Sequence, residues 1–344
     1  MTSHPDWGVR TRATDAATAF SKEIKGRYVL ITGVSRNSLG EASALAIAVH
    51  DPALLILASR TQSNLDEVAA EIHSIRPSTA VMTVQLDLLS LDSVRRAVAD
   101  IRESIPRLDV LINNAGMVTQ TRRTSPEGVE AQFATNHLGP FLLTNLLAPK
   151  LLAAAADAPS PGATRVVNVS SLGLRLSPVR FHDYNLEGAE VPPEERGPPD
   201  DALPAAFTRD VDGYRGFMAY GQSKTANVLF AVGLTERLRA KGVVAYALHP
   251  GSIWTNLSRD LTKDGYAAIE GTATDWKSPD EGAATIVVAA FDPALNGECE
   301  AGRFLSDCQY YDPPSYATDP EVAEKLWGLS EELAKEQFEY SAKL

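Results

Sequence analysis

Cysteine is scarce in this chain: Cys299 and Cys308 are the two cysteines among its 344 residues. Two cysteines are too few for a disulfide framework, and neither a CxxC pair nor a histidine-rich spacing accompanies them. The sequence therefore predicts a reducing compartment and no structural metal.

Positive charge is also in deficit. The chain carries 32 lysines and arginines against 44 aspartates and glutamates, which gives a formal net charge of -12 at pH 7. Nucleic-acid binding draws much of its affinity from Lys and Arg side chains that displace counterions, and anionic membrane surfaces attract basic segments in the same way. The acidic balance therefore argues against nucleic acid or an anionic membrane surface as a partner.

Long apolar runs are lacking as well. Residues 1–20 have no apolar segment of the kind found in secretory signal peptides. The most apolar window, Phe141–Ala156, is shorter than a bilayer span and contains Pro149 and Lys150. We therefore expect no membrane span and a cytoplasmic protein, while the C-terminal Ala342-Lys343-Leu344, which resembles a peroxisomal Ser-Lys-Leu signal, leaves the peroxisome open.

What the sequence does contain is an alternation of strand-length apolar runs with helix-period segments, which is the pattern of βαβ units. It predicts an α/β fold with a single doubly wound parallel sheet and helices on both faces. The predicted strands are Tyr28–Thr32, Leu54–Ala58, Ala80–Leu86, Val110–Ile112, Arg165–Val169 and Val243–Leu248. The predicted helices are Gly40–His50, Ser63–Ile75, Leu91–Ser104, an interrupted Glu127–Ala155, Ala219–Lys241 and a terminal helix near Pro320–Tyr340.

Two stretches depart from this alternation. Residues 177–216 carry six prolines, and a loop of this length is usually a lid, a binding segment or a disordered insertion. The other stretch is the tail after Ser306. We therefore expect an N-terminal extension (1–24), a catalytic domain (25–306) that contains the insertion on its substrate side, and a C-terminal helical tail (307–344) packed on the domain.

A glycine turn, Thr32-Gly33-Val34-Ser35-Arg36-Asn37-Ser38-Leu39-Gly40, follows the first predicted strand and opens an alanine-rich helix. Such a turn lets the backbone approach a pyrophosphate at a helix N-terminus. The strict G-x-G-x-x-G pattern is absent, so the turn by itself is also compatible with an ordinary strand-to-helix connection.

The end of the second predicted strand indicates which dinucleotide the turn would hold. An NAD site has an acidic residue about 20 positions after the turn, where it accepts a hydrogen bond from the ribose 2′-hydroxyl. Here Ser59 and Arg60 occupy that place, and no carboxylate comes before Asp66. Together with Arg36 as a second cation, they suit a 2′-phosphate, so we expect NADP(H); either arginine alone could also be a solvated surface residue.

Further motifs complete a recognisable set. Asn113-Asn114-Ala115-Gly116 follows the fourth predicted strand, Ser170-Ser171 the fifth and Pro250-Gly251 the sixth, while Tyr220 and Lys224 share a predicted helix. With the glycine turn and Asn136, this set resembles the short-chain dehydrogenases/reductases over about residues 25–255, and it implies a Rossmann-type fold and an oxidoreductase.

Three other segments refine the resemblance. Phe181-His182-Asp183, Ser223-Lys224-Thr225-Ala226-Asn227 and Lys325-Leu326-Trp327 are similar to the retinol-dehydrogenase-like and WW-domain-oxidoreductase-like branch of that family, as found in fungal reductases. The glycine turn departs from the family pattern, because the spacing from Gly33 to Gly40 is one position longer than usual and Ser38 replaces the middle glycine.

The spacing of Tyr220 and Lys224 has a chemical meaning of its own. Residues four apart on a helix project from one face into one site. A free tyrosine has a pKa of about 10, and lowering it to about 7 to 8 requires roughly 3 to 4 kcal/mol, which one or two nearby cations can supply. We therefore expect Tyr220 to be the acid/base, with its pKa lowered by Lys224 and by the positive nicotinamide of an oxidised cofactor.

The resemblance assigns the remaining roles. Ser171, rather than Ser170, would hydrogen-bond the substrate oxygen, and Asn136 would anchor a water that links Lys224 to solvent; a locally satisfied helix residue is the alternative for Asn136. The expected catalytic residues are thus Asn136, Ser171, Tyr220 and Lys224. The expected cofactor-binding residues are Gly33, Ser35, Arg36, Ser38, Leu39, Gly40, Ser59, Arg60, Asp87, Asn114, Ala115, Gly116, Tyr220, Lys224, Pro250, Gly251, Ile253 and Thr255.

The insertion brings apolar and aromatic side chains close to Tyr220 in the sequence, which suits a hydrophobic carbonyl compound; a solvated insertion anchored by a few aromatics is the alternative. The side chains concerned are Phe181, Tyr184, Phe207, Tyr214 and Phe217. Trp254, Trp276 and Trp327 would cover the substrate cleft or pack the tail.

These features predict NADPH-dependent reduction of a ketone or aldehyde, or the reverse oxidation, on a hydrophobic small molecule in secondary metabolism. Two alternatives stay open: a nucleotide-sugar epimerase or dehydratase, for which no sugar-binding domain is evident, and a non-catalytic NADP-sensing protein, which would not need the proton-transfer residues. The resemblance further implies a homodimer or homotetramer through the helices at Phe133–Ala155 and Ala219–Lys241.

Overall fold

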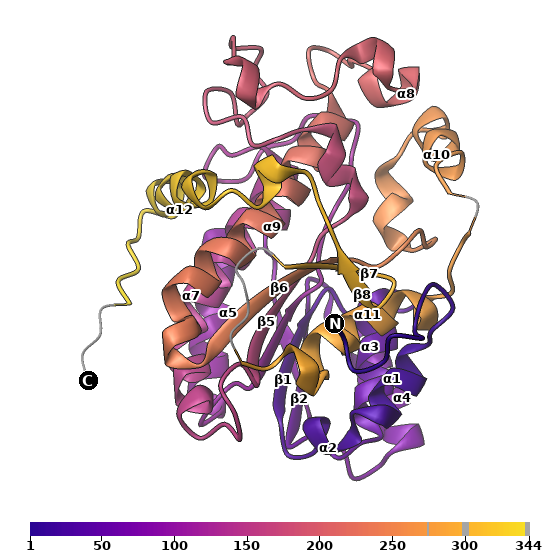
Figure 1. Ribbon diagram of the computed structural model, residues 1–344, viewed down its shortest axis with the longest axis vertical. Helices are drawn as coiled ribbons and strands as arrows, with labels where there is room; N and C mark the ends of the chain where they lie inside the picture. The colour runs from indigo at the N-terminus through magenta and orange to yellow at the C-terminus, as the bar shows by residue number, and fades with distance from the viewer. Residues whose placement is uncertain (274, 298–302, 341–344) are drawn as a thin grey trace.

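The computed structural model describes residues 1–273, 275–297 and 303–340, so Cys299 and the C-terminal Ala342-Lys343-Leu344 lie outside the described residues. A central sheet has the strand order β3-β2-β1-β4-β5-β6-β7-β8 (Figure 1). All neighbouring strands are parallel except β8, which runs antiparallel to β7. The strands are β1 (Tyr28–Thr32), β2 (Leu54–Ser59), β3 (Val81–Gln85), β4 (Val110–Asn113), β5 (Thr164–Val169), β6 (Val243–His249), β7 (Phe304–Ser306) and β8 (Gln309–Tyr311).

Helices cover both faces of the sheet, which confirms the predicted α/β fold (Figure 1). One face carries α1 (Ala13–Ala19), α3 (Leu39–Ala48), α4 (Gln62–Ile75) and α11 (Pro279–Phe291). The other carries α5 (Leu91–Ser104), α7 (Gly139–Ala156), α9 (Gly216–Leu238) and α12 (Pro320–Ala334). The strands in the middle read as continuous apolar runs because both of their faces are buried.

Strands β7 and β8 and helix α11 are among the elements that the sequence analysis missed. Strands β7 and β8 have three residues each, too few to show a period. The boundary expected after Ser306 falls inside their hairpin, where Asp307 and Cys308 adopt positive φ angles. Helix α11 did leave a signal: Ser278 and Glu281 form a capping box ahead of its apolar run.

The long helical segment Ala131–Ala156 contains α6 (Ala131–Phe133), a π-helical turn at Ala134–Leu138 and α7. The turn is the interruption that the sequence predicted, and Asn136 lies in it. The segment is longer than the apolar window Phe141–Ala156 and is long and apolar enough to cross a membrane. However, 67% of its most apolar 18-residue window is buried inside the fold. Such burial is typical of the core helix of a globular domain.

The ends of the chain pack onto this core. Helix α1 lies against α11 and α3, and α2 (Ser21–Ile24) leads into β1. Helix α12 packs on α9 and ends at Ala334, earlier than predicted, because Lys335 turns left-handed with a φ of 53°. Beyond it, Tyr340 donates to Asn145 on α7. The chain's own C-terminal segment thus packs on α9 and contacts Phe141 and Asn145 of α7, the helices through which the resemblance implied a homodimer or homotetramer.

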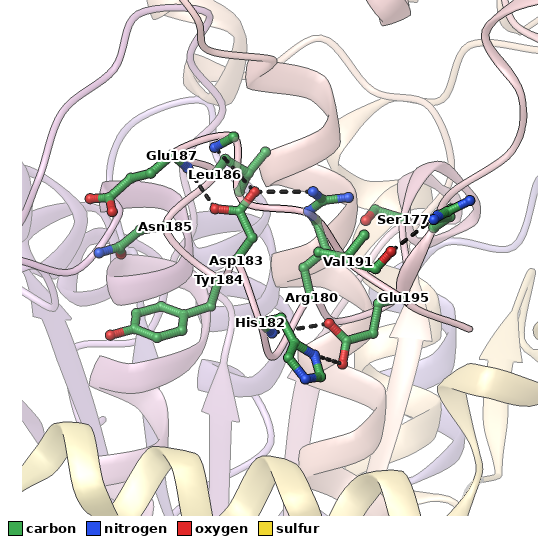
Figure 2. Close-up of polar contacts among 12 residues, drawn as sticks. Ser177, Arg180, His182, Asp183, Tyr184, Asn185, Leu186, Glu187, Val191 and Glu195 are labelled. Atoms are coloured by element: carbon green, nitrogen blue, oxygen red, sulfur yellow. Dashed lines mark hydrogen bonds and ion pairs between the residues drawn. The ribbon is translucent and has the colours of Figure 1, made fainter. Parts of the chain in front are cut away.

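The insertion and α10 (Lys263–Glu270) lie together at the upper end of the molecule in Figure 1, where α8 (Ala205–Thr208) contacts α10. Polar contacts organise the insertion (Figure 2). The Asp183 carboxylate pairs with Arg180 at 3.0 Å and accepts from the Glu187 amide at 2.7 Å. These contacts give the insertion a defined structure of its own within the fold.

Candidate active site

A cavity of about 460 Å³ opens at the carboxyl ends of the central strands. The strand order reverses between β1 and β4, and ligands of doubly wound sheets bind in the crevice at such a reversal. Of the predicted catalytic and cofactor residues, all line this cavity except Arg36, Gly40 and Asn136, counted over the part of the chain that the structure describes.

The glycine turn is built for close backbone approach. Gly33 has a φ of +74°, and a Cβ there would lie 2.6 Å from the Ala115 Cα. A Cβ on Gly40 would lie 2.7 Å from the Gly33 carbonyl oxygen. Ser38, which replaces the family's middle glycine, caps α3 by accepting a hydrogen bond from the Glu41 amide at 3.1 Å. The longer turn therefore still ends in a capped helix N-terminus that faces the cavity.

Arg36 does not take the place that the sequence analysis expected. Its guanidinium lies 2.7 Å from a Glu41 carboxylate oxygen and also pairs with Glu71. These two ion pairs keep the guanidinium out of the cavity lining. Glu41 can reach Arg36 because it lies in the first turn of α3, which follows the glycine turn. Arg60 differs: it lines the cavity and has no ion-pair partner among the described residues.

Tyr220 and Lys224 project from α9 into the same cavity. The Lys224 Nζ lies 5.6 Å from the centroid of the Tyr220 ring and donates to the Val169 carbonyl at 3.0 Å. Lys224 is 4% exposed, whereas Tyr220 is half-buried and reaches the cavity. The phenol is hydrogen-bonded to Ser171. Three of the expected catalytic side chains are therefore brought together.

The adjacent serines have different partners. Ser170 is buried and donates to the Lys224 carbonyl at 2.7 Å, which fixes β5 to α9. Ser171 stands at the start of a 3-10 turn, where its Oγ accepts from the Gly173 amide at 3.0 Å and faces Tyr220. The geometry thus favours Ser171 over Ser170 as the residue that can reach a substrate oxygen.

Burial governs the ionisation of this group. It raises the pKa of Tyr220 to about 12, although the hydrogen bond with Ser171 acts in the opposite direction. Desolvation of the phenolate sets this direction in the protein alone, whereas the lowering expected from the sequence also needs the positive nicotinamide of an oxidised cofactor and stays a prediction. Burial also lowers the pKa of Lys224 to about 8. The protein alone therefore presents a neutral phenol beside a lysine that is close to losing its proton.

Asn136 lies behind the cavity wall. Its Oδ1 accepts from the Met117 amide at 2.8 Å, and its Nδ2 donates to the Met117 carbonyl at 3.0 Å and to the Ser223 hydroxyl at 2.9 Å. These bonds fix the loop after β4 against α9. They describe a positioning residue, and the water that the resemblance implies for it stays a prediction.

The outer part of the cavity is apolar, although only some of the expected aromatics supply it. Phe207 and Phe217 line it, joined by Leu176, Ile269 and Trp276. The other three aromatics of the insertion contact the body of the protein instead. Phe181 lies under Lys325, Tyr184 packs near Phe133, and the buried Tyr214 donates to Glu130.

The tryptophans divide between the two roles considered above. Trp276 lines the cavity and stacks on Trp254, whose other face stacks on Tyr266 of α10. Trp327 packs the tail, with its ring centroid 5.0 Å from that of Phe141. His249 also lines the cavity, and burial lowers its pKa to about 4, so it is neutral near pH 7.

Comparison with known proteins identifies the family. The profile described as short chain dehydrogenase matches residues 27–185. Retinol dehydrogenase 14 from Homo sapiens is 34% identical over 322 residues, which cover 89% of this chain and 85% of that protein. The chain belongs to the short-chain dehydrogenase family.

Two further comparisons agree. Oxidoreductase fscI from Fusarium equiseti is 38% identical to this short-chain dehydrogenase over 247 residues, 71% of this chain and 94% of that protein. A crystal structure of an uncharacterized protein from Mycobacterium paratuberculosis has a TM-score of 0.64 at 29% identity, covering 92% of this chain and 96% of that one. The similarity to retinol dehydrogenase 14 confirms the retinol-dehydrogenase-like branch that the sequence motifs implied, and together with the similarity to fscI it supports an oxidoreductase acting on alcohols or carbonyls.

The short-chain dehydrogenase also brings residues to the cavity that the sequence analysis missed. Thr61 and Asn64 extend the lining beyond Arg60, and Leu257 and Arg259 enter from the turn after β6. Thr61 and Asn64 could have been found, because they directly follow the strand end that was considered. No sequence pattern predicts Arg259 as a cavity residue, because its position at the cavity depends on how the segment after Thr255 folds back over the site.

Proposed function

We propose that this short-chain dehydrogenase is an NADP(H)-dependent enzyme that reduces a ketone or aldehyde, or oxidises the corresponding alcohol, on a hydrophobic small molecule. One observation carries the proposal: a single cavity joins Tyr220, Ser171 and Lys224 to Arg60, a guanidinium without a carboxylate partner among the described residues. Such a reaction needs a group that transfers the proton to or from the substrate and a cation that binds the phosphate of the cofactor, and this cavity contains both.

The lining residues fit the cofactor. Gly33 and Gly40 leave backbone space for a pyrophosphate at the N-terminus of α3. Ser59 and Arg60 offer a hydroxyl and a guanidinium where an NAD site would present a carboxylate. When bound, the nicotinamide cofactor supplies or accepts the hydride.

Tyr220 is the proposed proton donor of the reduction. Its pKa of about 12 keeps the phenol protonated near neutral pH, so it can protonate the carbonyl oxygen as negative charge develops there. Ser171 then donates a hydrogen bond to the same oxygen and orients it. The Lys224 ammonium, 5.6 Å from the ring centroid, stabilises the phenolate that remains.

The apolar outer cavity supports a hydrophobic substrate. Phe207, Phe217 and Trp276 present flat surfaces next to the catalytic group, and ring-containing carbonyl compounds bury well against such faces. We therefore propose that the substrate is a hydrophobic, ring-containing carbonyl compound. A role in secondary metabolism and a cytoplasmic location, with the peroxisome as the alternative, are carried over from the sequence as proposals.

The experiment is to incubate purified protein with NADPH or NADH and a panel of hydrophobic carbonyl compounds. We expect turnover with preference for NADPH, and a loss of about 100- to 10,000-fold in kcat for Tyr220→Phe with little change in NADPH affinity. Tyr28→Phe, at the opposite end of β1, is the matched control and should keep full activity. Tight NADPH binding without turnover by the wild type would favour a sensing protein, and conversion of a nucleotide sugar would favour an epimerase or dehydratase.

A further inference from the structure

Two arginines from distant parts of the sequence line the same cavity, and neither has a carboxylate partner within residues 1–273, 275–297 and 303–340. Arg60 follows β2, and Arg259 belongs to the 3-10 turn Asn256–Asp260 after β6. Arg259 donates a hydrogen bond to the Asn256 carbonyl at 2.9 Å, and no ion pair forms on either arginine among the described residues. In a protein with a net charge of -12, unpaired guanidiniums on one cavity wall require an explanation.

The surrounding contacts hold Arg259 in this place. Thr255 caps the turn by accepting from the Leu257 amide at 3.3 Å, and Asn256 donates to the Arg36 carbonyl at 3.0 Å. The turn is thereby fixed to the glycine turn beneath it. The neighbouring Asp260 forms its ion pair with Arg123, at 3.6 Å, and acts on Arg259 only through its nearby charge.

The two guanidiniums repel each other where they stand. Partial burial of the Arg259 side chain and the nearby charges of Arg60 and Arg123 lower its pKa, and they outweigh the opposite effect of Asp260. Like charges at close range raise the energy of a site until an anion lies between them. The polar side chains beside them, Ser59, Thr61 and Asn64, add donors suited to a phosphate oxygen.

We propose that Arg259 and Arg60 together bind one phosphate group of the dinucleotide, so that the turn after β6 clamps the cofactor from the side opposite β2. The inference rests on the proposed use of a nicotinamide dinucleotide. In this proposal Arg259, and not Arg36, is the second cation beside Arg60, because Arg36 is in ion pairs with Glu41 and Glu71. Arginine suits this role because its planar fork binds a phosphate in bidentate fashion.

The test measures nucleotide affinity rather than turnover, by tryptophan fluorescence or calorimetry on the full chain. The probes are NADPH, NADH, adenosine 2′,5′-bisphosphate and ADP. We expect Arg259→Gln and Arg60→Gln each to weaken NADPH binding by about 10- to 100-fold, the loss typical of one charge-assisted contact. Arg239→Gln, which precedes β6 at the opposite end of the sheet, controls for the loss of one positive charge.

The probes separate the two phosphate sources. A loss confined to NADPH and adenosine 2′,5′-bisphosphate assigns the pair to the 2′-phosphate, and an equal loss for ADP and NADH assigns it to the pyrophosphate; both support the clamp. Unchanged affinity of Arg259→Gln for all four probes overturns it. A wild type that prefers NADH contradicts the proposed NADP(H) dependence instead, so the two failures are distinguishable. Because Arg259 is exposed on a short turn, a melting curve equal to that of the wild type shows that the variant is folded.

Discussion

At the scale of single residues, the site is held together at a cost to stability. Lys224 is 4% exposed, and among the described residues its ammonium donates one hydrogen bond, to the Val169 carbonyl. Burial lowers its pKa from 10.5 to about 8, so keeping it charged at pH 7 costs about 3 kcal/mol. A core residue selected for stability alone would be apolar here, which marks Lys224 as a residue kept for its chemistry.

Lys224→Met is therefore expected to lower activity strongly without lowering the free energy of unfolding at pH 7. The folded state binds fewer protons than the unfolded state between pH 8 and 10.5, so the penalty is complete below about pH 8 and disappears as pH rises through that window. Denaturant titrations of wild type and variant across this range measure the difference. A variant less stable than the wild type by several kcal/mol at pH 7 would contradict this account. Lys22→Met, on exposed α2, serves as the control.

At the scale of elements, the insertion is anchored by a buried carboxylate. The side chain of Glu195 accepts from the His182 amide at 3.0 Å, from the His182 ring at 2.8 Å and from Lys325 of α12 at 3.3 Å (Figure 2 shows the His182 contacts). Burial raises the pKa of Glu195, but these hydrogen bonds outweigh it and hold the pKa below its usual value. The insertion is thus tied to the C-terminal helix, and through it to the body of the enzyme.

Glu195→Gln should loosen this anchor. We expect a loss of about 1 to 3 kcal/mol in unfolding free energy at neutral pH, with faster proteolytic cleavage of the insertion. The variant's KM for the carbonyl substrate should rise more than its KM for NADPH. Since the folded pKa is lowered, the contribution exists above about pH 4.5, the ordinary value, and is lost as pH falls through the folded pKa. Glu190→Gln, an exposed carboxylate 3.9 Å from Arg196, is the matched control. Equal cleavage rates in the two variants would contradict the anchor.

At the scale of the whole molecule, the C-terminal segment closes one side of the fold. Trp327 of α12 packs between the ring of Phe141, at 5.0 Å, and that of Phe230, at 6.0 Å. Helix α9 is buried along almost its whole length, leaving Glu236 as its one exposed residue. Faces that are already covered within one chain cannot serve as a subunit interface.

We accordingly expect the full chain to be a monomer at micromolar concentration, measured by light scattering after size-exclusion chromatography. Trp327→Ala removes the centre of the covering contact and should lower the unfolding free energy by about 3 to 5 kcal/mol, the range for large aromatic residues in cores. Ile75→Ala, at a position that is 49% exposed, should change little. A stable dimer formed through α7 and α9 would refute this arrangement.

The sequence by itself determined strands β1 to β6, the glycine turn and the neighbourhood of Tyr220 and Lys224, because these depend on local spacing: apolar runs, strand ends and one helical turn. The tertiary structure alone decided the direction of the Tyr220 pKa shift, since desolvation depends on everything packed around the phenol. It also decided that Arg36 is held by Glu41 and Glu71 while Arg259 lines the cavity. Partners of this kind come from segments far apart in the chain, and only the folded arrangement of the elements brings them within reach of one another.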